Sequence, residues 1–166
     1  MRRVRLSFAG REIEFVDRDL ALRQVEDWVN RGMALPRVVY GPEGCGKTAW
    51  LRQSAELLRE LDFDVIYVTP IESTFIIELG IMDLRNRIMD LIREATSQTA
   101  WGRVIWSIID IARSAIEAGV RKLAIIVDDA FQVIGLNKAA IYVKGLLGIL
   151  EHPPAGYERV IAIAAT

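Results

Sequence analysis

The sequence predicts an α/β fold: a mainly parallel sheet in a three-layer arrangement, with helices on both faces. Short, continuously apolar segments recur at residues 37–40, 64–69, 122–129 and 159–164. Longer segments with apolar residues at helical spacing separate them. Strands that are apolar on both faces are typical of parallel sheets covered by helices on both sides.

Composition indicates one globular domain. The chain has 166 residues, 52% of them hydrophobic and 26% charged, which excludes a disordered chain. With a net charge of −1 and a pI near 5.9, nucleic-acid binding is not indicated. A single cysteine excludes an intrachain disulfide. The sequence has neither a signal-peptide core nor an uncharged segment long enough to cross a membrane, so we expect a cytoplasmic protein.

The first 16 residues are expected to form a β-hairpin. Residues 4–8 and 11–15 alternate apolar and polar side chains around Ala9-Gly10, which predicts a two-residue turn. Residues 17–166 are expected to form a nucleotide-binding core within the same domain. Its first helix begins near Asp19, with Asp17 as a candidate N-cap, and ends at Gly32.

The remaining elements alternate along the chain. A strand at 37–40 leads into a helix from about Lys47, and a strand at 64–69 ends at Pro70. Two helices are expected between about 83 and 119, followed by a strand at 122–129. Asn137 is the candidate cap of a helix that ends near residue 150, and the last strand covers 159–164.

A glycine-rich loop, GPEGCGKT, joins the strand at 37–40 to the next helix. Its spacing, GxxxxGK[ST], and its position between strand and helix are those of a phosphate-binding P-loop. The glycines allow successive N–H groups to converge on phosphate oxygens at a helix N-terminus. Lys47 is expected to reach the β- and γ-phosphates, and Thr48 to bind Mg²⁺. The predicted nucleotide-binding residues are Gly41, Pro42, Glu43, Gly44, Cys45, Gly46, Lys47 and Thr48.

Two acids end the buried strand at 122–129. Ligands of open α/β sheets lie at the carboxyl ends of strands, so Asp128 is the candidate acid on the Mg²⁺ side, either directly or through water. Asp129 is then the candidate residue that orients or deprotonates the attacking water. The predicted ligands are ATP and Mg²⁺.

These motifs together resemble the archaeal AAA-type ATPases, in the additional-strand branch of P-loop NTPases and near the STAND signalling ATPases. GPEGCGKT resembles their Walker A motif, and VDDAFQ at 127–132 resembles their Walker B motif. FVDR, from Phe15 to Arg18, resembles the box that precedes their first long helix. The likeness spans nearly the whole chain.

The resemblance implies further site residues. Phe15 and Arg18 would lie near the adenine, and the strand after Walker B would lie between the Walker A and Walker B strands. That strand usually ends in a polar residue that senses the γ-phosphate, so Thr166 becomes the candidate sensor. Asp129 stands where this branch most often has the longer Glu. Relative to the family, we expect a core that lacks the last strand and the C-terminal helical domain, which leaves a sheet edge open to a second copy or a partner protein.

Three functions are compatible with these motifs. The first is an Mg²⁺-dependent ATPase whose nucleotide state controls conformation or assembly. The second is a scaffold or binding module that binds ATP without hydrolysing it. The third is a small-molecule phosphotransferase, which ranks last because no arginine-rich lid is evident.

Overall fold

A computed structural model describes residues 5–8, 11–14, 19–151 and 158–166. Its central sheet has five strands in the order β3-β7-β6-β4-β5. The strands are β3 (Arg37–Val39), β4 (Asp64–Thr69), β5 (Thr74–Glu78), β6 (Lys122–Val127) and β7 (Arg159–Ala165). The first four strands in that spatial order pair in parallel, which confirms the mainly parallel sheet.

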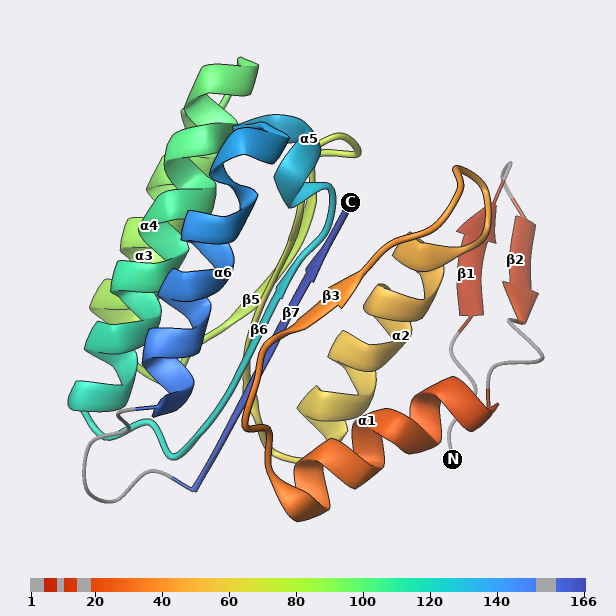
Figure 1. Ribbon diagram of the computed structural model, residues 1–166, viewed down its shortest axis with the longest axis horizontal. Helices are drawn as coiled ribbons and strands as arrows, with labels where there is room; N and C mark the ends of the chain where they lie inside the picture. The colour runs from red at the N-terminus through yellow and green to blue at the C-terminus, as the bar shows by residue number, and fades with distance from the viewer. Residues whose placement is uncertain (1–4, 9–10, 15–18, 152–157) are drawn as a thin grey trace.

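Helices cover both faces of this sheet (Figure 1). α1 (Asp19–Arg31) and α2 (Lys47–Glu60) lie on one face. α3 (Met82–Arg93), α4 (Gln98–Glu117) and α6 (Leu136–Glu151) lie on the other, together with the short α5 (Ala130–Ile134). Each face of the sheet therefore has its own apolar core, and the three-layer prediction is confirmed.

The strands are apolar on both faces because both faces are buried. In β6, Ile125 and Val127 belong to the core beneath α4, whereas Ala124 and Ile126 belong to the core beneath α2. All four side chains are fully buried. Continuous apolar runs, rather than alternating ones, follow directly from this position.

Two elements were not expected from the sequence. β5 pairs antiparallel with β4 through a turn in which the Ser73 N–H donates to the Pro70 carbonyl. Only Ile77 of β5 is buried, and the apolar run of β5, residues 75–77, is shorter than those of β6 and β7. α5 occupies a single short segment directly after Asp129.

The predicted cap at Asn137 is wrong. α6 already begins at Leu136, so Asn137 lies inside the helix. Gly135, with a φ of +87°, separates α5 from α6 in a conformation that other residues rarely adopt. Gly135, not Asn137, is therefore the residue that directly precedes α6.

The N-terminal hairpin forms as expected. β1 (Arg5–Phe8) pairs antiparallel with β2 (Arg11–Glu14), and Phe8 is opposite Arg11. The predicted turn at Ala9-Gly10 and the candidate cap Asp17 lie outside the described residues. In the described part of the chain, no helix is long and apolar enough to cross a membrane.

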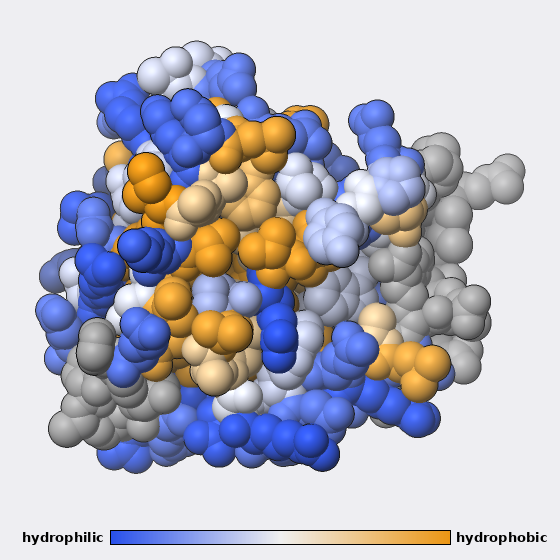
Figure 2. Space-filling view, viewed as in Figure 1, coloured by the Kyte–Doolittle hydropathy of each residue, from blue (hydrophilic) through white to orange (hydrophobic). Residues whose placement is uncertain are grey.

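β3 lies at one edge of the sheet and pairs only with β7 among the described strands. Figure 2 shows that apolar side chains gather on this side of the molecule. Val38 on β3 is 42% exposed, and Leu136 and Ile141 on α6 are also exposed. The expected open edge is thus present in the described sheet.

Candidate functional site

The glycine loop connects β3 to α2 at the carboxyl edge of the sheet, as predicted (Figure 1). Gly44 and Gly46 have φ values of +78° and +82°, which favour glycine. A Cβ atom on Gly44 would meet nothing within 4 Å, so space remains open beside the loop. A Cβ on Gly41 would instead come within 3.1 Å of the Cys45 Sγ.

The Lys47 side chain folds back on this loop. Its Nζ donates to the carbonyl oxygens of Gly41, at 2.7 Å, and Pro42, at 3.0 Å. The ammonium group therefore lies within the loop, and residues 41–45 around it are exposed. A cation in an accessible glycine loop at a helix N-terminus suits an anionic ligand.

A hydrogen bond joins the glycine loop to the acidic motif that follows β6. Thr48 Oγ1, in the first turn of α2, donates to Asp128 Oδ2 at 2.5 Å. Asp128 is fully buried, and its Oδ1 accepts the Asp129 N–H at 2.9 Å. Its own backbone N–H donates to the Val68 carbonyl of β4. The carboxylate is thus fixed in one orientation beside the P-loop helix.

This donor set fits Mg²⁺. A hydroxyl and a carboxylate are hard oxygen ligands, and Mg²⁺ in nucleotide sites is typically held by one or two protein oxygens together with phosphates. A second observation points the same way. The hydroxyl of Thr69, at the end of β4 and next to Asp128 in the register, is buried without a hydrogen-bond partner among the described residues. An unpartnered buried hydroxyl favours a water molecule or ligand at this place.

Asp129 lies at the turn between β6 and α5. Its φ of +50° is in the left-handed region, which Asp tolerates better than most residues. Burial, followed by the nearby carboxylates of Asp128 and Glu72, raises the pKa of Asp129 to about 6, although Lys47 opposes this shift. A carboxylate with this pKa is a stronger base than an ordinary Asp.

Glu72 and Arg52 also lie near this site, although neither was predicted from the sequence. Glu72 lies in the turn between β4 and β5, and its carboxylate is 4.0 Å from the guanidinium group of Arg52 on α2. Arg52 follows Thr48 by one helical turn. No local pattern marks Glu72, because an acid in a short turn is unremarkable until the fold brings the turn beside Asp129.

Thr166 follows β7, which lies between β3 and β6 as the resemblance implied. The Thr166 backbone N–H donates to the Val39 carbonyl at 3.1 Å. Thr166 therefore lies beside Val39, the last residue of β3 before the chain continues into the glycine loop. Phe15 and Arg18 lie outside the described residues.

The structure thus brings Lys47, Thr48, Asp128 and Asp129 together at one end of the sheet.

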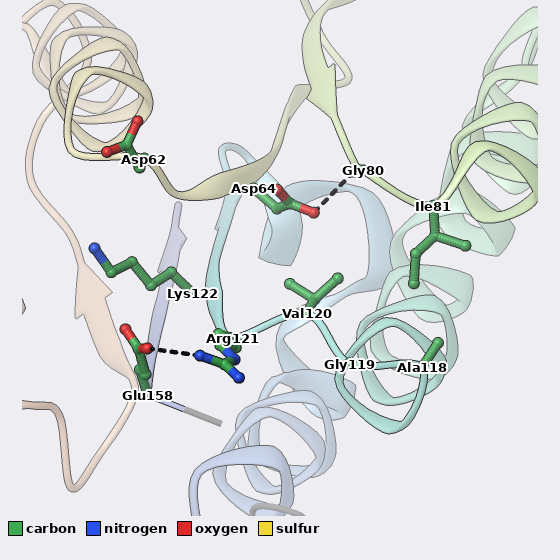
Figure 3. Close-up of a pocket in the computed structure, with 10 residues that line it drawn as sticks. All are labelled: Asp62, Asp64, Gly80, Ile81, Ala118, Gly119, Val120, Arg121, Lys122 and Glu158. Atoms are coloured by element: carbon green, nitrogen blue, oxygen red, sulfur yellow. Dashed lines mark hydrogen bonds and ion pairs between the residues drawn. The ribbon is translucent and has the colours of Figure 1, made fainter. Parts of the chain in front are cut away.

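A cavity of about 530 Å³ lies at the opposite end of the sheet, where β4 and β6 begin (Figure 3). Three of its charged side chains already have partners: Asp64 accepts the Gly80 N–H, and Arg121 lies 3.7 Å from Glu158. α4 also ends there, and the partial negative charge of a helix C-terminus disfavours phosphate. The glycine loop therefore suits a phosphate ligand better than this cavity does.

A mainly parallel sheet of this strand order, with a glycine loop, its lysine and a Thr–Asp hydrogen bond to the end of β6, defines the protein as a P-loop NTPase. Residues 15–166 match the family described as the ATPase domain predominantly from Archaea, and the chain belongs to that family. The family match confirms the resemblance to the archaeal ATPases.

The structure of AMPPCP-bound DnaA from Aquifex aeolicus is similar to this chain, with a TM-score of 0.46 and 18% sequence identity. The match covers 92% of this chain and 40% of the DnaA chain. A comparison with curated proteins gives no match.

Proposed function

We propose that this domain binds ATP with Mg²⁺ at the P-loop and hydrolyses it as a conformational switch or assembly ATPase. The hydrogen bond between Thr48 and Asp128 is the observation that carries the proposal. It brings the two Mg²⁺-side oxygens, which lie 80 residues apart in the sequence, into direct contact. Membership of an ATPase domain family supports the same reaction.

The residues of the loop have distinct roles in this proposal. The backbone N–H groups of the loop from Glu43 to Thr48 bind phosphate oxygens. Lys47 exchanges its bonds to the loop carbonyls for bonds to the β- and γ-phosphates. Thr48 and Asp128 would hold Mg²⁺. The bound ion would stabilise the negative charge that develops on the phosphate oxygens.

The remaining candidates act around the γ-phosphate and the base. Asp129 orients or deprotonates the attacking water, and its pKa of about 6 keeps it largely ionised at neutral pH. Thr166 senses the γ-phosphate from the end of β7. Phe15 and Arg18 contact the adenine, a role that rests on the resemblance alone.

Two substitutions test the proposal by separating binding from hydrolysis. We expect Lys47→Ala to abolish Mg²⁺-dependent ATP binding in isothermal calorimetry. We expect Asp129→Asn to bind ATP with nearly unchanged affinity but to release phosphate at a rate at least 100-fold lower, within the range that general-base catalysis supplies.

The alternative is a module that binds ATP without turnover. It predicts that the unmodified chain releases no phosphate above the background of the Lys47→Ala variant, although it binds ATP. Unchanged ATP binding in Lys47→Ala would contradict both functions, because each assigns the phosphates to this loop.

A further inference from the structure

A second hollow, of about 400 Å³, lies beside the nucleotide site. It is bounded by the end of β4, the start of α4 and the short helix α5, which lie at the same end of the sheet as the glycine loop (Figure 1). Its volume falls within the usual range of ligand pockets, about 300–1,000 Å³. None of its eight lining residues belongs to the glycine loop or carries a charge.

The lining is apolar with an amide rim. Pro70, Ile71, Trp101 and Val133 supply the apolar surface, and Ile71 is 60% exposed although it is a large aliphatic side chain. Gln98 and Gln132 contribute side-chain amides, and Thr96 and Ser97 are the other polar residues of the lining. This chemistry contrasts with that of the larger cavity at the other end of the sheet, whose lining includes Asp, Glu, Lys and Arg (Figure 3).

Charge around the hollow restricts what it accepts. Glu72 directly follows Ile71, and Asp129 is three residues before Gln132. Both acids disfavour an anion, and the neutral lining offers a bound cation no direct ion pair. An uncharged group with an apolar body is the occupant that this surface matches.

α5 connects the hollow to the candidate catalytic residue. It begins directly after Asp129 and contributes Gln132 and Val133 to the lining. Gln98, in the first turn of α4, donates through Nε2 to the carbonyl oxygens of Gln132, at 3.1 Å, and Val133, at 3.4 Å. A group in the hollow therefore contacts the element that positions Asp129.

We propose that this hollow is a second binding site, for an uncharged aromatic or branched aliphatic side chain presented by a partner peptide. The apolar side chain lies against Ile71, Trp101 and Val133. The side-chain amide of Gln132 and the side-chain carbonyl oxygen of Gln98 match the N–H and C=O groups of the flanking peptide backbone. A cavity of this volume holds one large side chain and its neighbouring peptide groups, not a helix.

Binding is tested on the full chain without nucleotide, so that the result is independent of the ATPase proposal. The probe is N-acetyl-phenylalaninamide, followed through backbone amide chemical shifts. We expect saturable shifts at Ile71, Trp101 and Val133. N-acetyl-alaninamide, which has the same amides without the large side chain, should bind at least about tenfold more weakly, because burial of the ring drives binding. N-acetyl-phenylalanine, which adds a carboxylate, should also bind more weakly.

A matched pair of variants locates the site. Ile71→Asp places a charge in the hollow and should weaken probe binding at least about tenfold. Ile141→Asp makes the same change at a residue of similar exposure, 62%, on α6, and should leave binding unchanged. Absence of saturable shifts up to the solubility limit of the probe overturns the proposal. Equal effects of the two variants, or equal binding of the alanine and phenylalanine amides, also overturn it.

Coupling to hydrolysis is a separate measurement that rests on the proposed function. At saturating probe, we expect the rate of phosphate release to change in the unmodified chain and in Ile141→Asp, but not in Ile71→Asp. If the chain hydrolyses no ATP, the ATPase proposal fails, while the binding experiment still decides whether the hollow is a site.

Discussion

At the scale of single residues, Asp128 combines a structural contact with a proposed role in the nucleotide site. It is fully buried, and burying a carboxylate costs free energy unless the group is hydrogen-bonded. Thr48 and the Asp129 N–H donate these hydrogen bonds. The same carboxylate is the proposed Mg²⁺-side acid, so the residue that serves the site also joins α2 to β6 across the fold.

Replacing Thr48 tests this double role. Thr48→Val removes the hydroxyl donor but keeps the shape of the side chain, so we expect the free energy of unfolding to fall by about 1–3 kcal/mol, because a buried acceptor loses its partner. Thr48→Ser keeps the hydroxyl and is the matched control. Urea unfolding without nucleotide measures both variants. Equal losses in the two would mean that the hydroxyl is not the stabilising group.

At the scale of elements, the close approach of α4 and α6 depends on Gly145. A Cβ atom at Gly145 would lie 2.6 Å from the Ile109 Cδ1, and Ile109 is almost fully buried. Tyr142, one turn earlier on α6, packs edge-on against Trp106 of α4 with ring centroids 5.3 Å apart. The small residue lets the two helices pack around these rings.

Two glycine substitutions should therefore have opposite effects on thermal stability. Gly145→Ala overpacks the α4–α6 contact, and we expect a loss of about 1–3 kcal/mol. Gly102→Ala lies within α4, where a Cβ meets nothing within 4 Å, and should gain up to about 1 kcal/mol from the better helix propensity of Ala. Calorimetric unfolding of both variants checks the signs. Stabilisation by Gly145→Ala would show that Ile109 moves aside without cost.

At the scale of the whole molecule, nucleotide binding should stabilise the fold, because the loop, α2 and β6 all contribute to one site. At an ATP concentration of 100 times Kd, the expected gain is about 2.7 kcal/mol. For a chain of this size, this corresponds to a rise in Tm of roughly 5–11 °C. Thermal unfolding with ATP and Mg²⁺ measures the shift. Lys47→Ala should show none, and a shift of equal size in that variant would place the nucleotide elsewhere.

The edge of the sheet is a second property of the whole molecule. β3 offers an unpaired edge among the described strands, and Val38 is exposed there. Exposed edges favour pairing with another chain, and a lysine on the edge opposes it. We expect concentration-dependent self-association in sedimentation, reduced by Val38→Lys with the unfolding free energy unchanged within about 0.5 kcal/mol. A single monomeric species at every concentration would contradict this expectation.

The amino-acid sequence by itself determined the buried strands, most of the helices and the glycine loop. These features are local: a strand buried on both faces must be apolar throughout, and a loop that curls around phosphate requires glycine at set positions. The strand at 64–69 accordingly has the bounds that its apolar run predicts. The family resemblance also came from local motifs.

Only the tertiary structure decided which groups meet. β5 was not predicted because its edge position leaves most of its side chains partly exposed, and α5 was not predicted because a five-residue helix is too short to show a period. The proximity of Glu72 to Asp129, the bond between Thr48 and Asp128, and the uncharged hollow beside α5 all depend on contacts between distant segments. Sequence spacing encodes which side of a helix or strand a residue occupies, but the packing of the layers decides which residue it contacts.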